Sequence, residues 1–257
     1  MKLITKTTSI SRANPSDTNW DAIWGRNKNR SLIDGPSTRT RIRLARKILK
    51  QYAKKGDSIL DVGCGSGALL GVLLREGIYA KLTGVDIANQ PLEFARKQYP
   101  VCVFHLLDVQ KEKLQEKFDI IVSLAALDII ADDKVALMHM SEMLQSGGYC
   151  VVSVQSNPAY WSALDNLRAY RRYTTHELEE KCARFGLQKV QAFQWGWPIY
   201  HWYYKILERY DTRLWSNEAK GVVTRLGASV LYVLFFLDDF FIFLGKGRQL
   251  FVVFQKK

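Results

Sequence analysis

The sequence predicts an α/β fold in which a doubly wound, mostly parallel sheet is covered by helices on both faces. From residue 58 onward, short apolar runs alternate with helix-like stretches. Such alternation is typical of βαβ units, whose parallel strands are buried on both sides. A glycine-rich turn joins the first apolar run to the first helix, which is where open α/β folds bind a ligand.

The elements follow in order along the chain. The expected strands are residues 58–62, 81–85, 101–109, 118–127, 149–155, 187–195 and 248–257. The expected helices are residues 68–76, 90–98 and 134–144, and a further helix that begins at Thr174 or Thr175 and stops near Gly186. Glu177 and Glu179 lie in the first turns of that helix, where acidic residues are favoured.

We expect one elaborated domain. A chain of 257 residues with 47% hydrophobic content can bury one large core. The predicted parts are a basic helical segment or lid at 1–55, a cofactor-binding core at 56–196, an insertion at 197–247 and a final strand at 248–257. The insertion is aromatic and apolar, and about fifty residues are too many for a structureless hairpin loop, so we expect helices there.

Charge is distributed unevenly. The net charge is +12, and residues 1–55 alone carry fourteen Lys and Arg against three Asp. A segment this basic is attracted to nucleic acid, anionic lipid headgroups or an acidic substrate, although a solvated helix face has the same composition. The N-terminus has no apolar stretch like that of a signal peptide, and the four cysteines lie far apart. These features predict a reduced cytoplasmic protein with no metal site.

The glycine-rich turn, ILDVGCGSGAL at residues 59–69, places Gly63, Gly65 and Gly67 after a strand that contains Asp61. Two cofactor classes fit glycines at this spacing. The pyrophosphate of a dinucleotide would be repelled by Asp61. The sulfonium and ammonium groups of S-adenosylmethionine would be attracted to it, while the glycine backbone lets the ligand approach closely. Asp61 therefore favours the cationic ligand.

Two more carboxylates end the next two strands. Asp86 can accept both ribose hydroxyls, but a dinucleotide fold also has an acid there. Asp108 can accept the adenine amino group while Val109 offers its backbone N–H to a ring nitrogen. Because parallel strands end at one edge of the sheet, these carboxylates are expected to line one crevice. Each alone has an ordinary alternative as a helix cap or a turn residue.

Residues 57–155 resemble the class I S-adenosylmethionine-dependent methyltransferases. The resemblance rests on five segments in order and spacing: ILDVGCGSG, LTGVD, LLDV, FDIIVSLAALDII and LQSGGYCVVSV. It implies a Rossmann-like, seven-stranded sheet whose last strand is antiparallel. It also implies that S-adenosylmethionine is the cofactor, with its methyl group bordered by Ser123, Leu124 and Ala125. The cofactor-binding residues implied are Asp61, Gly63, Cys64, Gly65, Gly67, Asp86, Ile87, Asp108, Val109, Ser123 and Leu124.

The acceptor site is predicted from aromatic and basic residues. The segment at 167–173, LRAYRRY, resembles a Gly-His-x-Arg-Arg-Tyr stretch of small-molecule and lipid- or glycan-pathway methyltransferases, but Ala169 replaces the histidine. Of the four histidines, His201 is the best placed to act in catalysis, although a lone histidine is more often structural. The predicted acceptor-binding residues are Trp20, Trp24, Tyr160, Trp161, Arg172, Tyr173, Trp197 and Tyr200. An aromatic lid over the acceptor and an ordinary aromatic core are both consistent with the insertion.

Residues 226–244, LGASVLYVLFFLDDFFIFL, are apolar except for Asp238 and Asp239. Their thirteen Leu, Ile, Val and Phe residues favour membrane insertion by about 4 to 8 kcal/mol, and two central aspartates oppose it by about 5 to 7 kcal/mol. The sum is near zero, which argues against a membrane span. A core helix, or an interfacial helix that makes peripheral membrane contact beside basic residues, fits better.

The predicted function is methyl transfer from S-adenosylmethionine to a small or amphipathic, lipid-like acceptor, at a hydroxyl group, in a biosynthetic pathway. Methyl transfer is an in-line displacement in which orientation supplies much of the rate, so a base is needed only when the acceptor keeps its proton. Three alternatives remain: an RNA methyltransferase that uses the basic N-terminus, an NAD-dependent oxidoreductase, and a catalytically silent binding module. No stacking-plus-basic RNA-recognition motif is visible, so a nucleic-acid partner is disfavoured.

Overall fold

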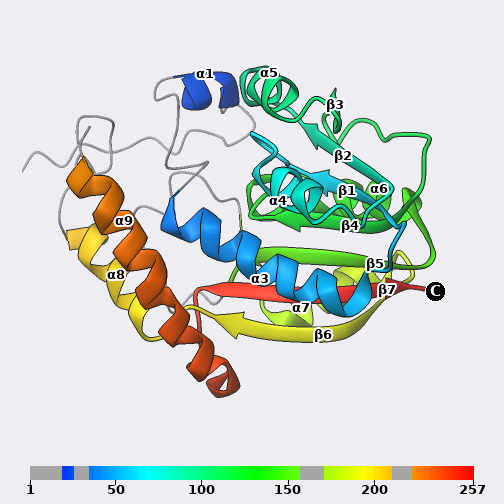
Figure 1. The fold of residues 1–257 in the computed structure, drawn as a ribbon. Coiled ribbons are helices and arrows are strands. Elements are labelled where there is room, and N and C mark those ends of the chain that lie inside the picture. Colours follow the sequence, from blue (N-terminus) through cyan, green and yellow to red (C-terminus); the bar gives the residue numbers. More distant parts are fainter. Residues whose placement is uncertain (1–18, 26–34, 157–170, 210–221) are drawn as a thin grey trace, which may run out of the picture.

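The structure is a computed structural model that describes residues 19–25, 35–156, 171–209 and 222–257. Its centre is a seven-stranded sheet with the strand order β3-β2-β1-β4-β5-β7-β6 (Figure 1). The strands are β1 (Ser58–Val62), β2 (Lys81–Asp86), β3 (Val103–Leu106), β4 (Phe118–Leu124), β5 (Leu144–Gln155), β6 (Leu187–Trp195) and β7 (Gln249–Lys256). The last strand, β7, is antiparallel to both β5 and β6, and the other pairs are parallel. The predicted sheet is confirmed.

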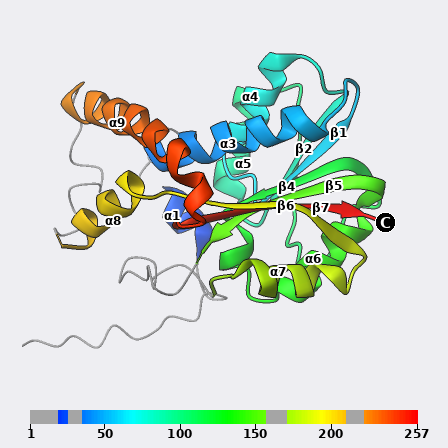
Figure 2. The same cartoon turned by 90° about the horizontal axis from the view of Figure 1, so that it is seen from below.

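The helices cover both faces. They are α1 (Trp20–Gly25), α3 (Pro36–Tyr52), α4 (Ala68–Glu76), α5 (Asn89–Gln98), η2 (Leu127–Ile129), α6 (Asp133–Glu142), α7 (Thr175–Ala183), α8 (Ile199–Arg209), α9 (Val222–Leu234) and η6 (Phe235–Leu244). Figure 2 shows α3, α4 and α5 on one side of the sheet and α6 and α7 on the other. The described part of the chain therefore has the doubly wound arrangement predicted from the alternating pattern.

Alternation along the strands divides the core into two clusters. In β1, Ile59 packs with residues of α3, α4 and α5, whereas Leu60 and Val62 pack with residues of α6 and α7. Successive side chains of a strand point to opposite faces, and here both faces are covered. Ile59 and Leu60 point to opposite faces and are both fully buried, which explains why both of these residues before Asp61 are apolar.

The helix α3 packs against the sheet as part of the core. The prediction had grouped this helix with a separate N-terminal segment that ended at residue 55. Its apolar side chains are buried against the sheet, with Leu44, Ala45, Ile48 and Leu49 no more than 2% exposed. The basic residues of the same helix alternate with these at helical spacing. A charge run that looks like a separate segment in the sequence is therefore the outer side of a core helix.

Local signals placed several element ends correctly. Thr174 and Glu177 form a capping box at the expected start of α7, with Glu177 N donating to Thr174 Oγ1 at 3.2 Å and Thr174 N donating to Glu177 Oε2 at 2.9 Å. Two strands differ from the prediction. β3 ends at Leu106, before Asp108, and β5 already begins at Leu144, where the end of a helix was expected.

The insertion between β6 and β7 consists of α8, α9 and η6 in its described part. Figure 1 shows α8 and α9 projecting beyond the edge of the sheet at which the parallel strands end. Tyr200 of α8 and Phe235 of η6 are buried and pack on Trp195 at the end of β6, with ring centroids 4.9 and 6.0 Å away. These contacts join the insertion to the core.

Candidate active site

A cavity of about 340 Å³ opens where β1, β2 and β4 end. The volume is in the range of small-ligand sites. The predicted residues that line it are Asp61, Gly63, Cys64, Gly65, Asp86, Ile87, Asp108, Val109, Leu124, Trp20 and Trp24. The crevice expected at this edge is therefore present, and it gathers residues from five separate stretches of the chain.

The glycine turn lets the backbone form one wall of the cavity. Gly63 and Gly65 have φ angles of +75° and +52°, which disfavour residues with a Cβ atom. A Cβ atom on Gly63 would lie 2.4 Å from the Cβ atom of Ala126, and one on Gly65 would lie 2.8 Å from the ring of Trp24. The turn is held in place because the N–H groups of Gly63 and Cys64 both donate to Val85 O.

The carboxylates Asp61 and Asp86 make the cavity strongly acidic. Asp61 is 3% exposed, and burial together with the charge of Asp86 raises its pKa to about 8. Burial also raises the pKa of Asp86, although its carboxylate accepts N–H bonds from Gly65 at 2.8 Å and Ala88 at 2.9 Å. Two neighbouring acids of this kind favour a ligand that brings positive charge.

The other walls come from the ends of β3 and β4. Asp108 and Val109 line the cavity beyond β3, and Asp108 accepts an N–H bond from Gln110 at 3.0 Å. Ala125, beyond β4, has a φ of +55°, an uncommon conformation for a residue with a side chain. Such strain costs about 1–3 kcal/mol and tends to occur at functional sites.

A family model described as a methyltransferase domain matches residues 53–210, which is more than half of the chain. The chain belongs to the class I S-adenosylmethionine-dependent methyltransferases. The matched residues run from the turn before β1 to the end of α8, so they contain the whole cavity wall formed by β1, β2, β3 and β4.

Curated relatives support this assignment. The chain is 34% identical over 118 residues to a trans-aconitate 2-methyltransferase from Enterobacter sp. (strain 638), covering 46% of this chain and 47% of the relative. It is 30% identical over 113 residues to a ubiquinone biosynthesis O-methyltransferase from Photorhabdus laumondii, covering 41% and 46%. The aligned region thus spans less than half the length of these curated relatives.

A solved structure with the same fold is the N-methyltransferase NodS from Bradyrhizobium japonicum in complex with S-adenosylhomocysteine. It superimposes with a TM-score of 0.55 and 18% identity, covering 88% of this chain and 90% of that chain. At this identity the likeness concerns the fold alone.

The residues of this methyltransferase fit S-adenosylmethionine. The buried carboxylate of Asp61 suits the ammonium and sulfonium groups, because a cation would offset the charge that burial disfavours. The glycines at 63 and 65 let Ala126 and Trp24 approach the turn more closely than a Cβ atom would permit, so the backbone of the turn can form the cavity wall. Asp86 would hold the ribose and Asp108 with Val109 the adenine, as the family pattern implies.

Two predicted cofactor residues lie behind the cavity wall. Gly67 does not line the cavity; it precedes α4, and a Cβ atom there would lie 3.0 Å from the ring of Phe104. Close packing of α4 against the sheet therefore explains why residue 67 is a glycine. Ser123 is fully buried within β4 and is also absent from the cavity wall, whereas Leu124 and Ala125 line it. Of the three residues predicted to border the methyl group, two are therefore placed to do so.

The short helix α1 covers the glycine turn. Trp20 and Trp24 line the cavity, and the Trp24 ring lies against Gly65. Asp21, between them in the sequence, accepts an N–H bond from Gln90 at the start of α5 at 2.7 Å. Both tryptophans, which were predicted to bind the acceptor, therefore line the cavity beside the glycine turn, and the anchor to α5 is a contact that the sequence did not suggest.

Sequence reasoning missed the acidic residue on the remaining side of the cavity. Asp128, at the start of the loop after β4, is 1% exposed and lines the cavity. Burial raises its pKa to about 6, and the charges of Arg41 and Arg172 limit the rise. Arg41 from α3 is the one Lys or Arg among the described cavity-lining residues. The available signal in the sequence is a polar residue that directly follows an apolar strand.

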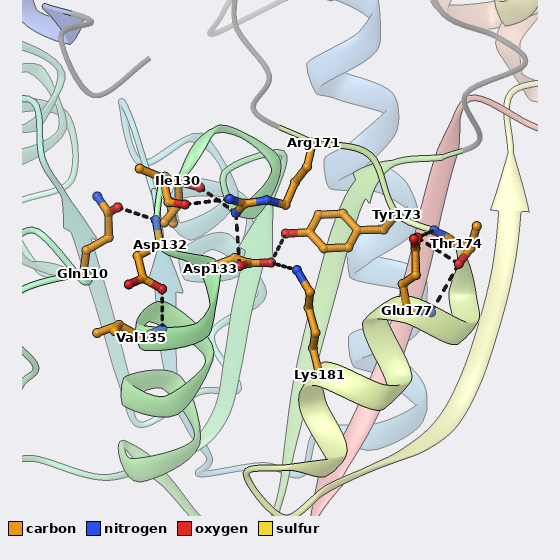
Figure 3. A network of polar contacts seen from close by, with 11 residues as sticks. Gln110, Ile130, Asp132, Asp133, Val135, Arg171, Tyr173, Thr174, Glu177 and Lys181 are labelled. Atoms are coloured by element: carbon orange, nitrogen blue, oxygen red, sulfur yellow. Dashed lines mark hydrogen bonds and ion pairs between the residues drawn. The ribbon is translucent and has the colours of Figure 1, made fainter. Parts of the chain in front are cut away.

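The Arg-Arg-Tyr segment supports this loop instead of binding the acceptor directly. Figure 3 shows Arg171, Tyr173 and Lys181 converging on the carboxylate of Asp133. Tyr173 is 1% exposed and donates to Asp133 at 2.8 Å, and Arg171 lies 3.2 Å from the same carboxylate. The prediction that Tyr173 contacts the acceptor therefore conflicts with its burial in this network.

The same network reaches the cavity wall through the backbone. The Arg171 guanidinium donates to Ile130 O at 2.9 Å and to Ala131 O at 2.6 Å, and both of these residues line the cavity. Arg172 does not line the cavity, but its positive charge limits the rise in the pKa of Asp128 that burial causes. The segment thus holds the loop that carries Asp128.

The insertion residues predicted for the acceptor site lie elsewhere. Tyr200 is 1% exposed within the aromatic core beside Trp195, and burial raises its pKa. The ring of His201 packs against Trp197 at 4.9 Å and is 7% exposed. None of Trp197, Tyr200 and His201 lines the described cavity, so a catalytic His201 is not supported by its position. Tyr160 and Trp161 lie outside the described residues.

Proposed function

We propose that this protein transfers the methyl group of S-adenosylmethionine to a hydroxyl group of a small or amphipathic acceptor in a biosynthetic pathway. The observation that carries the proposal is the set of carboxylates around the glycine turn, with the buried Asp61 beside the half-buried Asp86 at the ends of β1 and β2. The relative named as a ubiquinone biosynthesis O-methyltransferase supports an oxygen acceptor.

When bound, S-adenosylmethionine supplies a methyl group that its sulfonium has already activated for displacement. The residues of this chain orient the acceptor and exclude water. Trp20 and Trp24 cover the glycine turn, and Arg41 offers a cation to an acidic group of the acceptor. Asp128 is the group that would remove the hydroxyl proton, because its carboxylate lines the cavity and its pKa of about 6 leaves it ionised at neutral pH.

Calorimetry tests the cofactor assignment. We expect S-adenosylhomocysteine to bind and NADH not to bind, because Asp61 would repel a pyrophosphate. Asp86→Ala should weaken S-adenosylhomocysteine binding by about 1–3 kcal/mol through lost charge-assisted hydrogen bonds. Asp132→Ala is the matched control, since Asp132 is an exposed acid that caps α6 outside the cavity wall. Tighter binding of NADH than of S-adenosylhomocysteine would contradict the assignment.

Asp128→Asn tests the acceptor chemistry. With methyl-labelled S-adenosylmethionine and a panel of hydroxyl, carboxyl and amine compounds, a hydroxyl compound should be labelled. Its methylation should fall by about 10²- to 10⁴-fold in the variant, the usual contribution of a general base. S-adenosylhomocysteine affinity should stay within about threefold, well below the tenfold change that 1.4 kcal/mol represents.

The pH profile gives an independent readout of Asp128. With S-adenosylmethionine saturating, so that the titration of Asp61 does not enter, kcat/KM of the wild type for the acceptor should rise about tenfold per pH unit below the Asp128 pKa of about 6 and level off above it, because a base acts only in its ionised form. The small residual activity of Asp128→Asn should lack this rise. A variant as active as the wild type would exclude Asp128 as the base, and labelling of amines alone would exclude the hydroxyl acceptor.

A further inference from the structure

The outer face of the long helix formed by α9 and η6 is unusually apolar. Every exposed residue from Val230 to Leu244 is Val, Leu or Phe. Phe240 is 74% exposed and Phe243 is 80% exposed. Single exposed apolar residues are ordinary, but a continuous apolar face of this length marks an interaction surface. We call the exposed residues of 230–244 the apolar face.

The two aspartates of this helix point the other way. Asp238 is buried and accepts N–H bonds from Ile199 and Tyr200, both at 2.8 Å, so it caps the start of α8. Asp239 accepts two hydrogen bonds from the Arg43 guanidinium, at 2.5 and 2.9 Å. Both acids that interrupt the apolar sequence therefore have hydrogen-bond partners on the inner side, and the apolar face carries no charge.

The inner contacts also determine how the helix can meet a bilayer. Residues 226–244 are long and apolar enough to cross a membrane by length and composition. However, Phe235 is fully buried among Trp195 and Tyr200, and Asp239 also accepts a hydrogen bond from Trp195 Nε1 at 2.9 Å. A helix attached to the domain along one side cannot be surrounded by lipid, whereas its outer side can lie in the membrane interface.

Basic residues lie beside the apolar face. The neighbouring helix α3 contains six Lys and Arg residues and no acid, and two of the six, Arg43 and Arg46, form ion pairs with Asp239 and Glu76. Arg39 and Arg43 of α3 stack on Tyr232 and Phe236 of the long helix, each at 4.0 Å from the ring centroid. Lys246, just after η6, is exposed. Basic groups next to an apolar surface complement anionic lipid headgroups, each contributing about 1 kcal/mol near the bilayer.

We propose that the apolar face docks this protein onto an anionic phospholipid bilayer, with the long helix lying in the interface. A lipid surface fits better than a protein partner, because protein interfaces carry about one hydrogen bond per 100–200 Å² and the exposed residues of this face offer no side-chain donor or acceptor. The neighbouring helix α8, which packs on η6, also has two exposed apolar side chains, Trp202 and Ile206. Tryptophan is favoured at membrane interfaces.

Vesicle flotation of the full-length chain tests this inference. The protein should float with vesicles of phosphatidylcholine and phosphatidylserine and bind much less to phosphatidylcholine alone. Raising the salt from about 0.1 M to about 1 M shortens the Debye length from about 10 Å to about 3 Å and should weaken binding. The double variant Phe240→Glu/Phe243→Glu should lose binding by about tenfold or more, because both aromatic rings would leave the lipid.

The matched control is Val101→Glu, which adds a charge at an apolar residue that is 77% exposed before β3. It should bind vesicles as the wild type does. Circular dichroism melting of all variants checks that they remain folded without reference to cofactor or activity. Absence of vesicle binding by the wild type, or equal binding by the double variant, would overturn the proposal. So would a dimer in light scattering that the double variant abolishes, because the face would then pair with a second copy.

Discussion

At the scale of single residues, Asp61 shows how function opposes stability. Its carboxyl group is buried beside Asp86, and these two causes raise its pKa to about 8. The folded pKa exceeds the unfolded value of about 3.9, so the folded state holds the proton more tightly. The contribution of Asp61 to the stability of the ligand-free protein therefore falls as the pH rises from about 4 to about 8. A bound cation would remove this penalty.

Asp61→Asn should separate the effect of Asp61 on the stability of the ligand-free protein from its effect on cofactor binding. The neutral amide avoids the cost of a buried charge, so the ligand-free variant should melt at a higher temperature than the wild type at pH 8, by about 2–4 °C for each kcal/mol gained. The difference should vanish near pH 4. Binding of S-adenosylmethionine should weaken by about tenfold or more, through a lost charge-assisted interaction. Differential scanning calorimetry and titration calorimetry measure the two outcomes.

Asp119→Asn is a control of opposite sign. Asp119 accepts hydrogen bonds from Ser58 N at 2.8 Å and Ser58 Oγ at 2.7 Å, and the Ser58 backbone bond is the main cause that lowers its pKa. The stability that it contributes is present above the unfolded pKa and is lost as the pH falls. This variant should therefore be less stable than the wild type at neutral pH. Equal pH trends for the two variants would contradict the burial argument for Asp61.

At the scale of elements, α1 is expected to act as the lid of the cofactor half of the cavity. Trp24 lies over Gly65, and Asp21 ties α1 to the start of α5. Trp24→Ala should raise the dissociation rate of S-adenosylhomocysteine by about tenfold, because most affinity changes between related complexes lie in that rate. Deleting residues 1–30 should leave the sheet folded, since β1 begins at Ser58, and should sharply reduce turnover.

Stopped-flow fluorescence and a turnover assay measure these effects. Trp202→Ala is the matched control, because Trp202 is a tryptophan 59% exposed on α8 that does not line the cavity. Unchanged dissociation and turnover after loss of α1 would show that the segment is passive. The loop after β4 is also held by a distant segment of the chain. Arg171 donates hydrogen bonds to the carbonyl oxygens of Ile130 and Ala131 in this loop.

At the scale of the whole molecule, the common direction of the parallel strands determines where the cofactor residues lie. Parallel strands all end at one edge, so the cofactor residues collect there although they are dispersed in the sequence. The insertion extends from the same edge (Figure 1). Most of the net charge of +12 belongs to residues 1–55, and α3 brings part of it beside α9. The proposed membrane surface therefore depends on how separate segments pack together.

The sequence by itself determined the features that short-range rules control. Alternating apolar runs require buried strands and amphipathic helices, the glycines at 63 and 65 require a turn without Cβ atoms, and an acid at the end of β1 selects against a pyrophosphate. These rules were sufficient for the alternating strands and helices and for the glycine turn beside Asp61, whereas the antiparallel last strand was implied only by the resemblance to the family. They act between neighbours along the chain or across adjacent strands.

Only the tertiary structure decided which side of each helix faces inward. Asp238 and Asp239 interrupt an apolar sequence, but their effect depends on whether they meet lipid or Ile199, Tyr200 and Arg43. Likewise, Asp128 lines the cavity while His201 packs in the insertion, although both stand in apolar surroundings in the sequence. Whether a side chain is buried, and which polar group it pairs with, depends on the part of the same chain that packs against it. That surface comes from residues as far apart as 43 and 239, which no local pattern connects.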